Sequence, residues 1–474
     1  MSIHFTPSTP TISDLTLHLQ MAKPVAGPEQ TEIRSTFFPA EWFPQSGVQL
    51  TWPHAATDWA PLLAEVDDCF IRIALEILVR NELLLIVTPE PDRIKSLFHE
   101  RIPSRLLPHV RYFECPTNDT WARDHGFLTL MTESGPCLLD FQFNGWGGKF
   151  PAELDNEINR KLKPLYRPLS NSPRGGEDSV SSEGLSSGNA ALPPTGGAGR
   201  GAYPPTGGAG EGLLHGDYES HLDFVFEGGS IESDGRGTLM TTSACLLSPN
   251  RNPGLTQQQI EERLLRWFHA ERVLWLDHGY LAGDDTDSHI DTLARFCPGG
   301  TIAYVQCTDP ADEHYEALHL MEEQLSSLTS NLSTINHKPS SLNPPLGPTG
   351  RSTLGEPSAR PIGTLDPSRT LNPQPSPTGG PQGAFQLLPL PMPSPIYDPD
   401  DGHRLPATYA NFLIINGAVL MPTYGQPDTD DLARRQLQKA FPKYDIVPID
   451  CRVLIRQHGS LHCSTMQFPV GVLV

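Results

Sequence analysis

The 474-residue chain has no paired cysteines, no long apolar run and few basic residues. Its eight cysteines stand alone, at positions 69, 115, 137, 245, 297, 307, 451 and 463, and none forms a Cys-x-x-Cys pair. Isolated cysteines are typical of reduced thiols in a cytoplasmic protein and do not indicate a disulfide framework or a zinc site. We therefore expect a cytoplasmic location and no bound metal.

The chain also lacks the features of exported and membrane proteins. Its N-terminal sequence, MSIHFTPSTPTISDLTLHLQ, has no basic start followed by a long apolar core, so a secretory signal is not predicted. The longest apolar runs, such as 83–87 and 412–421, are too short or too interrupted to span a bilayer. We expect no membrane partner.

Basic residues are scarce, because 34 Lys and Arg stand against 55 Asp and Glu, a formal net charge of −21. Such a balance cannot neutralise a phosphate backbone, so nucleic acid is excluded as a partner. An acidic surface favours the approach of a cationic substrate, although it could serve solubility alone.

Apolar residues are also few, at 38 %, whereas Pro (48) and Gly (41) are in excess. Residues 167–212 and 327–382 are rich in Pro, Gly and Ser, and the first of them repeats the motif PPTGGAG. Neither has the apolar periodicity that offsets the entropy of ordering, so both are predicted to be disordered insertions. Pro-rich ligand segments for a partner are the alternative. Residues 1–30 are predicted to be a flexible N-terminal segment, and residues 31–474 a single domain.

The remaining sequence alternates predicted strands and helices, which indicates the α/β class. Buried strands are predicted at 83–87, 237–242, 300–307 and 412–420, and helices at 61–80, 256–270, 310–325 and 429–441. Thr256 is the capping residue of the second helix, whose apolar positions follow at helical spacing. This pattern does not distinguish one layered sheet from several blades.

The first segment that could carry chemistry is Asn118-Asp119-Thr120-Trp121-Ala122-Arg123-Asp124. Its two carboxylates can pair bidentately with a planar guanidinium, and the Trp121 indole can add a cation–π contact. A structural pair of Arg123 and Asp124 in a turn is the simpler alternative.

Two further segments place charged residues beside glycine or beside one another. Glu227 is followed directly by Gly228 and Gly229, where the backbone must approach something closely, unless the segment is a hairpin or bulge with an exposed glutamate. In Gly283 to Asp291, His289 and Asp291 would project to one face if the segment were extended, and such a histidine can act as acid and base. The acidic run lacks the regular oxygen spacing of a calcium loop, and a solvated acidic loop is the alternative.

The fourth segment is Gly459-Ser460-Leu461-His462-Cys463. An isolated cysteine is more often an inert core residue, but glycine and polar neighbours here suggest a tight, partly open turn. A nucleophilic thiolate needs a partner such as His289. Three carboxylates are more than a peptide carbonyl requires, and they suit a cationic guanidinium or amidinium carbon.

The order and wording of these segments resemble the agmatine deiminase / microbial-type peptidylarginine deiminase family of guanidino-group-modifying enzymes. The resemblance covers nearly the whole chain outside the two insertions. Besides the segments above it includes the motifs Phe38-Pro39-Ala40-Glu41-Trp42, Trp52-Pro53-His54, Asn144-Gly145-Trp146-Gly147-Gly148-Lys149 and Asn250-Arg251-Asn252-Pro253.

The resemblance implies a fold and a mechanism. The fold is the five-bladed α/β propeller, or pentein, of ββαβ units around a central active site. Cys463 is implied to attack the guanidinium carbon, Asp124 and Asp291 to hold its terminal nitrogens, His289 to act as acid and base, and Glu227 to orient His289. No metal or organic cofactor is implied.

The preferred function is hydrolysis of agmatine to N-carbamoylputrescine and ammonia, a step of polyamine biosynthesis. Trp121 and Asp119 are the candidates for binding the substrate's chain and distal amine. Deimination of peptidyl-arginine is the first alternative, because the residues at Asp287-Ser288 and after Cys463 differ from those that many agmatine deiminases carry there. A non-catalytic binding protein is the second. The sequence is also compatible with a homo-oligomer.

Overall fold

The computed structural model describes residues 36–162, 166–167, 213–335 and 385–474. The predicted N-terminal segment 1–30 and most of the two predicted insertions lie outside the described residues. Their disorder and the single-domain assignment therefore stay predictions.

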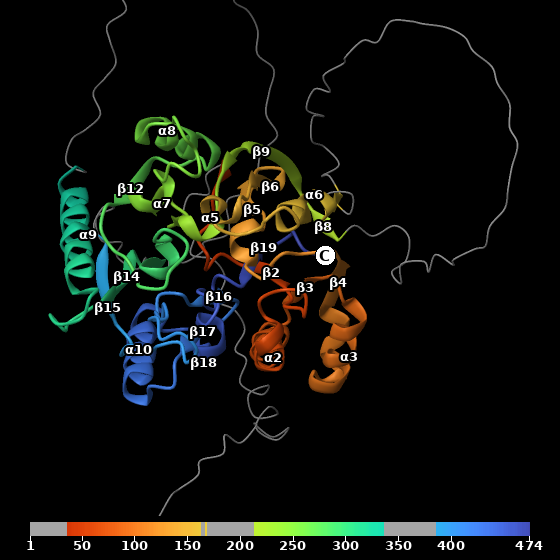
Figure 1. Cartoon of the computed structure of the whole chain (residues 1–474). Helices are drawn as coiled ribbons and strands as arrows, with labels where there is room; N and C mark the ends of the chain where they lie inside the picture. The colour runs from red at the N-terminus through yellow and green to blue at the C-terminus, as the bar shows by residue number, and fades with distance from the viewer. Residues whose placement is uncertain (1–35, 163–165, 168–212, 336–384) are drawn as a thin grey trace, which may run out of the picture.

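The described residues form five separate sheets of three or four strands and one two-stranded sheet (Figure 1). In each of the five larger sheets the strands lie in the following order, with neighbouring strands hydrogen-bonded to each other. The sheets are β1 (Thr36–Phe37), β5 (Leu128–Thr132), β6 (Gly135–Gln142) and β9 (Asp217–Val225); β10 (Glu232–Ser233), β11 (Thr238–Thr242) and β12 (Arg272–Leu276); β13 (Ala294–Cys297), β14 (Thr301–Gln306) and β15 (Gln386–Pro391); β16 (Leu413–Ile415), β17 (Ala418–Thr423) and β18 (Asp445–Asp450); and β19 (Thr465–Pro469), β2 (Gln45–Thr51), β3 (Leu83–Thr88) and β4 (Val110–Glu114).

Each of the five sheets contains the same unit, an antiparallel pair followed by a helical connection to a parallel third strand. The antiparallel pairs are β5–β6, β10–β11, β13–β14, β16–β17 and β19–β2, and the parallel partners are β9, β12, β15, β18 and β3. A parallel strand needs a long crossover connection, which explains why helices and strands alternate in the sequence. The α/β class is confirmed, whereas closure of the five units into a propeller stays a prediction.

The longer helices lie towards the outside of the molecule, with the strands nearer its middle (Figure 1). They are α2 (Leu63–Leu78), α3 (Pro91–Arg101), α8 (Gln257–Trp267), α9 (Tyr315–Ile335) and α10 (Pro427–Ala440). Thr256 is the N-cap of α8, as predicted, and the Thr256 hydroxyl and the Gln259 side chain form a reciprocal capping box. Among the described residues no helix is both long and apolar enough to cross a membrane.

Three sequence-based assignments differ from the structure. The segment 412–420 is not one strand but the hairpin β16–β17, because Asn416 and Gly417 form its turn and Gly417 has a φ of +75°. The second insertion does not begin at residue 327, because α9 continues to Ile335, and the first does not begin at Arg167, which pairs in the small sheet of β7 (Tyr166–Arg167) and β8 (Leu214–His215).

Candidate active site

Gly229 lies at the centre of the candidate site, in a 3-10 turn that spans Gly228–Ser230. A Cβ placed on Gly229 would lie 2.6 Å from His289 Nδ1, 2.9 Å from Asp124 Oδ1 and 3.2 Å from Asp291 Oδ2. Three of the predicted site residues, from two separate segments, therefore converge on a position that only glycine leaves open. Gly228 is equally crowded, because its Cβ would overlap the Arg123 carbonyl oxygen.

Cys463 lies in the turn that leads into β19 and is 4 % exposed. Its Sγ is 3.8 Å from Asp291 Oδ2 and accepts a hydrogen bond of 3.3 Å from the Asn411 amide nitrogen. The amide oxygen of Asn411 accepts from the backbone nitrogens of His462 and Cys463, so one side chain fixes the whole turn. Sequence reasoning missed Asn411, because a single asparagine before an apolar strand carries no distinguishing spacing.

His289 is fully buried, and neither of its ring nitrogens has a hydrogen-bond partner. Nδ1 lies 3.6 Å from Asp124 Oδ1, and Nε2 lies 3.9 Å from Glu227 Oε2. Both distances exceed a normal hydrogen bond. The imidazole is thus free to exchange a proton with a ligand.

The expectation that residues 289–291 are extended was wrong. Residues Ile290–Thr292 form a 3-10 turn that begins after His289. His289 and Asp291 nonetheless meet at Gly229, since the turn rather than strand alternation brings them together. The solvated-loop alternative holds only for part of the segment, because Asp285 is 39 % exposed whereas Asp291 is fully buried.

The two aspartates that face Gly229 are held by different donors. Asp124 accepts hydrogen bonds of 3.0 Å from the Gly229 backbone nitrogen and from the Trp146 indole. Asp291 Oδ2 lies 2.7 Å from His462 Nδ1, and its Oδ1 has no partner. Asp291 Oδ1 can therefore receive a donor from a ligand.

Glu227 is fully buried, and both of its oxygens accept from Arg251 Nε at 2.9 Å. The alternative of a hairpin with an exposed glutamate was wrong. The close backbone approach predicted for Gly228 and Gly229 is confirmed.

Asp119, Trp121 and Arg123 do not join the cluster. Asp119 Oδ1 accepts from the Trp59 indole at 2.9 Å, and Arg123 pairs with Glu41 at 3.1 Å rather than with Asp124. Trp121 is 4 % exposed and its ring is so close to Gly459 that a Cβ there would overlap it. Trp121 therefore packs against the turn that carries Cys463.

The pKa values of these groups show how unevenly charge is balanced in the site. Burial, together with Asp291 and Asp124, raises the pKa of the Cys463 thiol well above its usual value. Burial alone would lower the pKa of His289, but Asp124, Cys245 and Glu227 raise it well above its usual value. Burial raises the pKa of Asp124 to about 6, against the opposing effect of His289. The arrangement disfavours a buried thiolate until a further positive charge is bound.

Burial would also raise the pKa of the other two carboxyls, but their partners outweigh it. Arg251 and His289 lower the pKa of Glu227, and His462 lowers that of Asp291. Glu227 and Asp291 are therefore favoured in their ionised form, and each contributes a negative charge to the site.

Two clusters of the described residues bring metal-binding atoms within 4.8 Å of one another, namely Glu227, Cys245 and His289, and Glu41, Glu232 and His462. In each cluster an arginine already contacts the carboxylates. Arg251 donates to Glu227, and Arg295 donates to Glu41 and Glu232. A guanidinium therefore supplies the positive charge in both.

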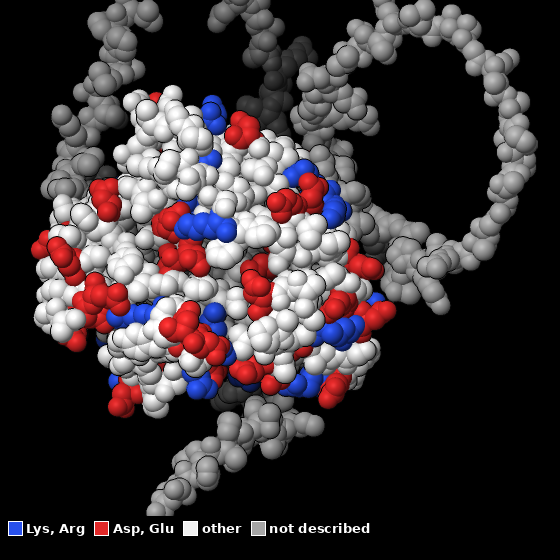
Figure 2. Space-filling model, viewed as in Figure 1, with Lys and Arg blue, Asp and Glu red and all other residues white. Residues whose placement is uncertain are grey.

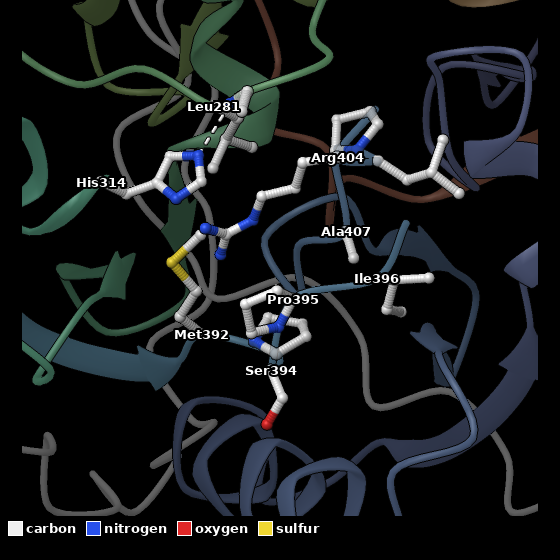
Figure 3. A pocket seen from close by; sticks show the side chains of 12 residues that line it. Leu281, His314, Met392, Ser394, Pro395, Ile396, Arg404 and Ala407 are labelled. Carbon is white, nitrogen blue, oxygen red and sulfur yellow. Dashed lines mark hydrogen bonds between the residues drawn. The ribbon is translucent and has the colours of Figure 1, made fainter. Parts of the chain in front are cut away.

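A small cavity lies beside the segment that leads to His289 (Figure 3). In it the His314 ring accepts a 2.7 Å hydrogen bond from the Ala282 backbone nitrogen, and Arg404 pairs with Asp312 at 2.8 Å. A Cβ on Gly283 would overlap the Arg404 carbonyl oxygen. The residues around this cavity thus anchor the start of the segment 283–291, and its charged groups already have protein partners.

The fold and the site together define an α/β protein in which an imidazole and two carboxylates converge on one glycine, with a buried thiol beside one carboxylate and a third carboxylate facing the imidazole. The model of the Porphyromonas-type peptidyl-arginine deiminase family matches residues 37–339 and 378–469. The chain belongs to this family.

Several relatives share nearly the full length of the chain. A Vibrio parahaemolyticus protein provisionally named an agmatine deiminase is 31 % identical over 435 residues, which cover 91 % of this chain and 96 % of that protein. A Porphyromonas gingivalis structure, provisionally named an arginine deiminase, is 40 % identical with a TM-score of 0.67 and covers 93 % of this chain and 100 % of its own. An agmatine deiminase of C. jejuni, a cysteine-to-serine variant with substrate bound, is 30 % identical with a TM-score of 0.64 and covers 94 % of this chain and 99 % of its own.

Proposed function

We propose that this protein hydrolyses the guanidinium group of agmatine, releasing ammonia and N-carbamoylputrescine. The convergence of Cys463, His289, Asp124 and Asp291 around Gly229 carries this proposal. The agmatine deiminases among its relatives support the choice of substrate. We also propose that the five repeated units close into a propeller around this site.

A guanidinium fits the charge of the site. It stays protonated in proteins because its pKa exceeds about 12, and two carboxylates can each accept from one terminal nitrogen. Asp124 and Asp291 are the carboxylates assigned to this role. Binding of the cation adds the positive charge that favours ionisation of the Cys463 thiol, so nucleophile and substrate activate each other.

The reaction proceeds in two balanced steps. Cys463 releases its thiol proton to solvent as the cation binds, and its sulfur forms a bond to the guanidinium carbon. The bond from that carbon to one terminal nitrogen breaks, and protonated His289 gives the departing nitrogen a proton. Ammonia leaves, and an amidino-thioether remains on Cys463. His289 then accepts a proton from water, the oxygen bonds to the carbon, and the carbon–sulfur bond breaks to give the ureido product and the thiol.

The rim of the site favours a substrate with a second positive charge. The segment before His289 runs from Asp285, which is 39 % exposed, to the fully buried imidazole, whereas Asp287 is already paired with Lys149 and Arg251. Figure 2 shows Asp and Glu side chains outnumbering Lys and Arg on the face seen in Figure 1. A dication such as agmatine gains from this field, whereas the carboxylate of free arginine is repelled.

Ammonia release from agmatine, free arginine and an arginyl peptide tests the assignment. We expect kcat/KM to be highest for agmatine, and a preference for the peptide would replace agmatine by peptidyl-arginine as the substrate. Release from none of the three would favour a non-catalytic binding protein.

A further inference from the structure

The mechanism proposed above gives no role to the buried guanidinium of Arg251, which contacts Glu227 directly. This side chain is fully buried, in the segment after the short helix α7 (Ser243–Leu246). Its Nε contacts both oxygens of Glu227, its Nη1 donates to Asp287 Oδ2 at 2.6 Å, and its Nη2 donates to the Thr286 carbonyl oxygen at 2.8 Å. One guanidinium thus binds two separate segments of the chain.

Both of those segments determine where His289 lies. On one side, Glu227 faces the Nε2 atom of the imidazole. On the other, the Thr286 hydroxyl accepts a 3.0 Å hydrogen bond from the His289 backbone nitrogen. Arg251 therefore reaches the histidine through a carboxylate and through the preceding loop.

The loop needs such an anchor because its backbone is strained. Asp287 and Ser288 have φ values of 63° and 65°, a left-handed conformation that non-glycine residues adopt only at an energetic cost. The contacts of Arg251 stabilise this strained conformation, as does a 2.8 Å hydrogen bond from the Thr242 hydroxyl to the Ser288 carbonyl oxygen.

Only arginine can make this set of contacts. Its planar fork offers donors on three nitrogens in fixed directions, whereas a lysine is a single point donor. Its charge matters as well, because Arg251 is the strongest influence that opposes the effect of burial on Glu227. The other groups that face Glu227 are His289, whose charge favours the carboxylate, and Asp124 and Cys245, whose negative forms oppose it.

We propose that Arg251 is a positioning residue for deimination, holding Glu227 as a carboxylate against His289 and fixing the loop that carries this histidine. The inference rests on the proposed function. It also gives a role to the motif Asn250-Arg251-Asn252-Pro253, in which the Asn252 side chain ties the Arg251 segment to the Val225 backbone by bonds of 3.0 and 2.8 Å.

Lys149 offers a matched comparison, because it anchors the same loop without touching Glu227. Its ammonium lies 2.6 Å from Asp287 Oδ1 and 2.6 Å from the Asp285 carbonyl oxygen, and its side chain is 34 % exposed. Loss of this anchor affects the loop alone. Lys149→Met therefore separates the loop effect from the carboxylate effect.

The test measures kcat for agmatine across the neutral pH range in the wild type, Arg251→Lys, Arg251→Gln and Lys149→Met. For Arg251→Lys we expect kcat to fall about 10- to 100-fold, the usual cost of losing a partner that orients a reactive group. In both Arg251 variants Glu227 takes up a proton more readily, so we also expect the acid limb of the kcat profile to move to higher pH. The move should be larger for Arg251→Gln, which loses the positive charge, than for Arg251→Lys, which keeps it. Lys149→Met should lower activity without moving the limb.

Arg93 supplies a structural control, because its guanidinium also bridges two carboxylates, Asp67 and Glu90, and a carbonyl oxygen. Arg93→Lys should leave the pH profile unmoved. In a Glu227→Gln background, Arg251→Lys should cost less than it does in the wild type, because only the loss of the loop contacts then remains.

Equal loss of kcat at every pH for both Arg251 variants, or losses that multiply with Glu227→Gln, would overturn the inference. If thermal unfolding shows that the lysine variant is poorly folded, Arg251→Gln and the double variant give the same comparison. A wild type that releases no ammonia from agmatine, arginine or an arginyl peptide would instead refute the proposed function itself.

Discussion

At Gly229 the absence of a side chain is what lets three candidate site residues come together. Gly229→Ala should lower kcat/KM for agmatine by about 100-fold or more, because a Cβ at 2.6 Å from His289 Nδ1 forces the reactive groups apart and small misplacements are costly. Backbone strain is not the reason, since Gly229 is not among the residues with positive φ. Activity assays paired with thermal unfolding check this, and wild-type activity in a folded Gly229→Ala variant would contradict the geometry.

The pKa of Asp124 predicts a pH dependence at the residue scale. Its carboxyl, with a pKa raised to about 6, loses its charge as the pH falls through that value and then no longer attracts a guanidinium. We therefore expect kcat/KM, which reports the free enzyme, to fall below about pH 6. The fall of kcat at acid pH should occur at a lower pH than the fall of kcat/KM, because the bound cation keeps Asp124 ionised in the complex. An identical limb in both profiles would argue against Asp124 as the group that titrates.

At the scale of elements, Glu82 lies buried beneath the β16–β17 hairpin. Its Oε1 accepts a 2.6 Å hydrogen bond from the Asn416 backbone nitrogen, and its Oε2 has no partner. Burial raises the pKa of Glu82 to about 8 from the model-compound value of 4.5. The native state therefore keeps a proton that the unfolded state loses, and stability declines as the pH rises from about 4.5 towards 8.

Glu82→Gln removes this penalty while it retains the acceptor for Asn416. We expect it to stabilise the protein at neutral pH by on the order of 2–4 kcal/mol, with little effect below the unfolded-state pKa. Glu76→Gln is the matched control, because Glu76 pairs with Arg72 and Arg80 at 2.7 Å and its neutralisation should destabilise. Urea unfolding at acid and neutral pH compares the two, and a destabilised Glu82→Gln at neutral pH would show that the carboxyl is ionised in the native state.

The elements also show where sequence reasoning succeeded and where it failed. Strand 83–87 and the helix after Thr256 were predictable because their signals are local, an apolar run and a capping box. The hairpin at Asn416-Gly417 was missed because the apolar run on both sides outweighed a two-residue turn signal.

The candidate site residues were predicted from residue type and family resemblance, but the contacts among them could not be predicted from the sequence. The partners of Cys463 and Glu227, which are Asn411 and Arg251, lie 52 and 24 residues away along the chain. Such pairs depend on how separate sheets are arranged, which no local pattern encodes. For the same reason Arg123 was given the wrong partner.

At the scale of the whole molecule, the ends of the first predicted insertion lie next to each other. β7 and β8 pair in parallel, with Tyr166 opposite Leu214 and Arg167 opposite His215. A short connection can therefore replace the chain between them, and closure of a shorter loop costs little. Replacing residues 170–211 by a short Gly/Ser linker should leave kcat/KM for agmatine within about 2-fold of the wild type and unfolding cooperative. A loss of activity would show that this segment contributes to the site.

The chemistry of Cys463 is tested most directly by intact-protein mass spectrometry of enzyme mixed with agmatine and quenched in acid. The mechanism predicts a transient adduct on Cys463 whose mass equals agmatine less ammonia, absent from Cys463→Ser. Ammonia release in that variant should fall by at least about 10³-fold. Turnover of agmatine by Cys463→Ser at a rate near that of the wild type would contradict the assignment of Cys463 as the nucleophile.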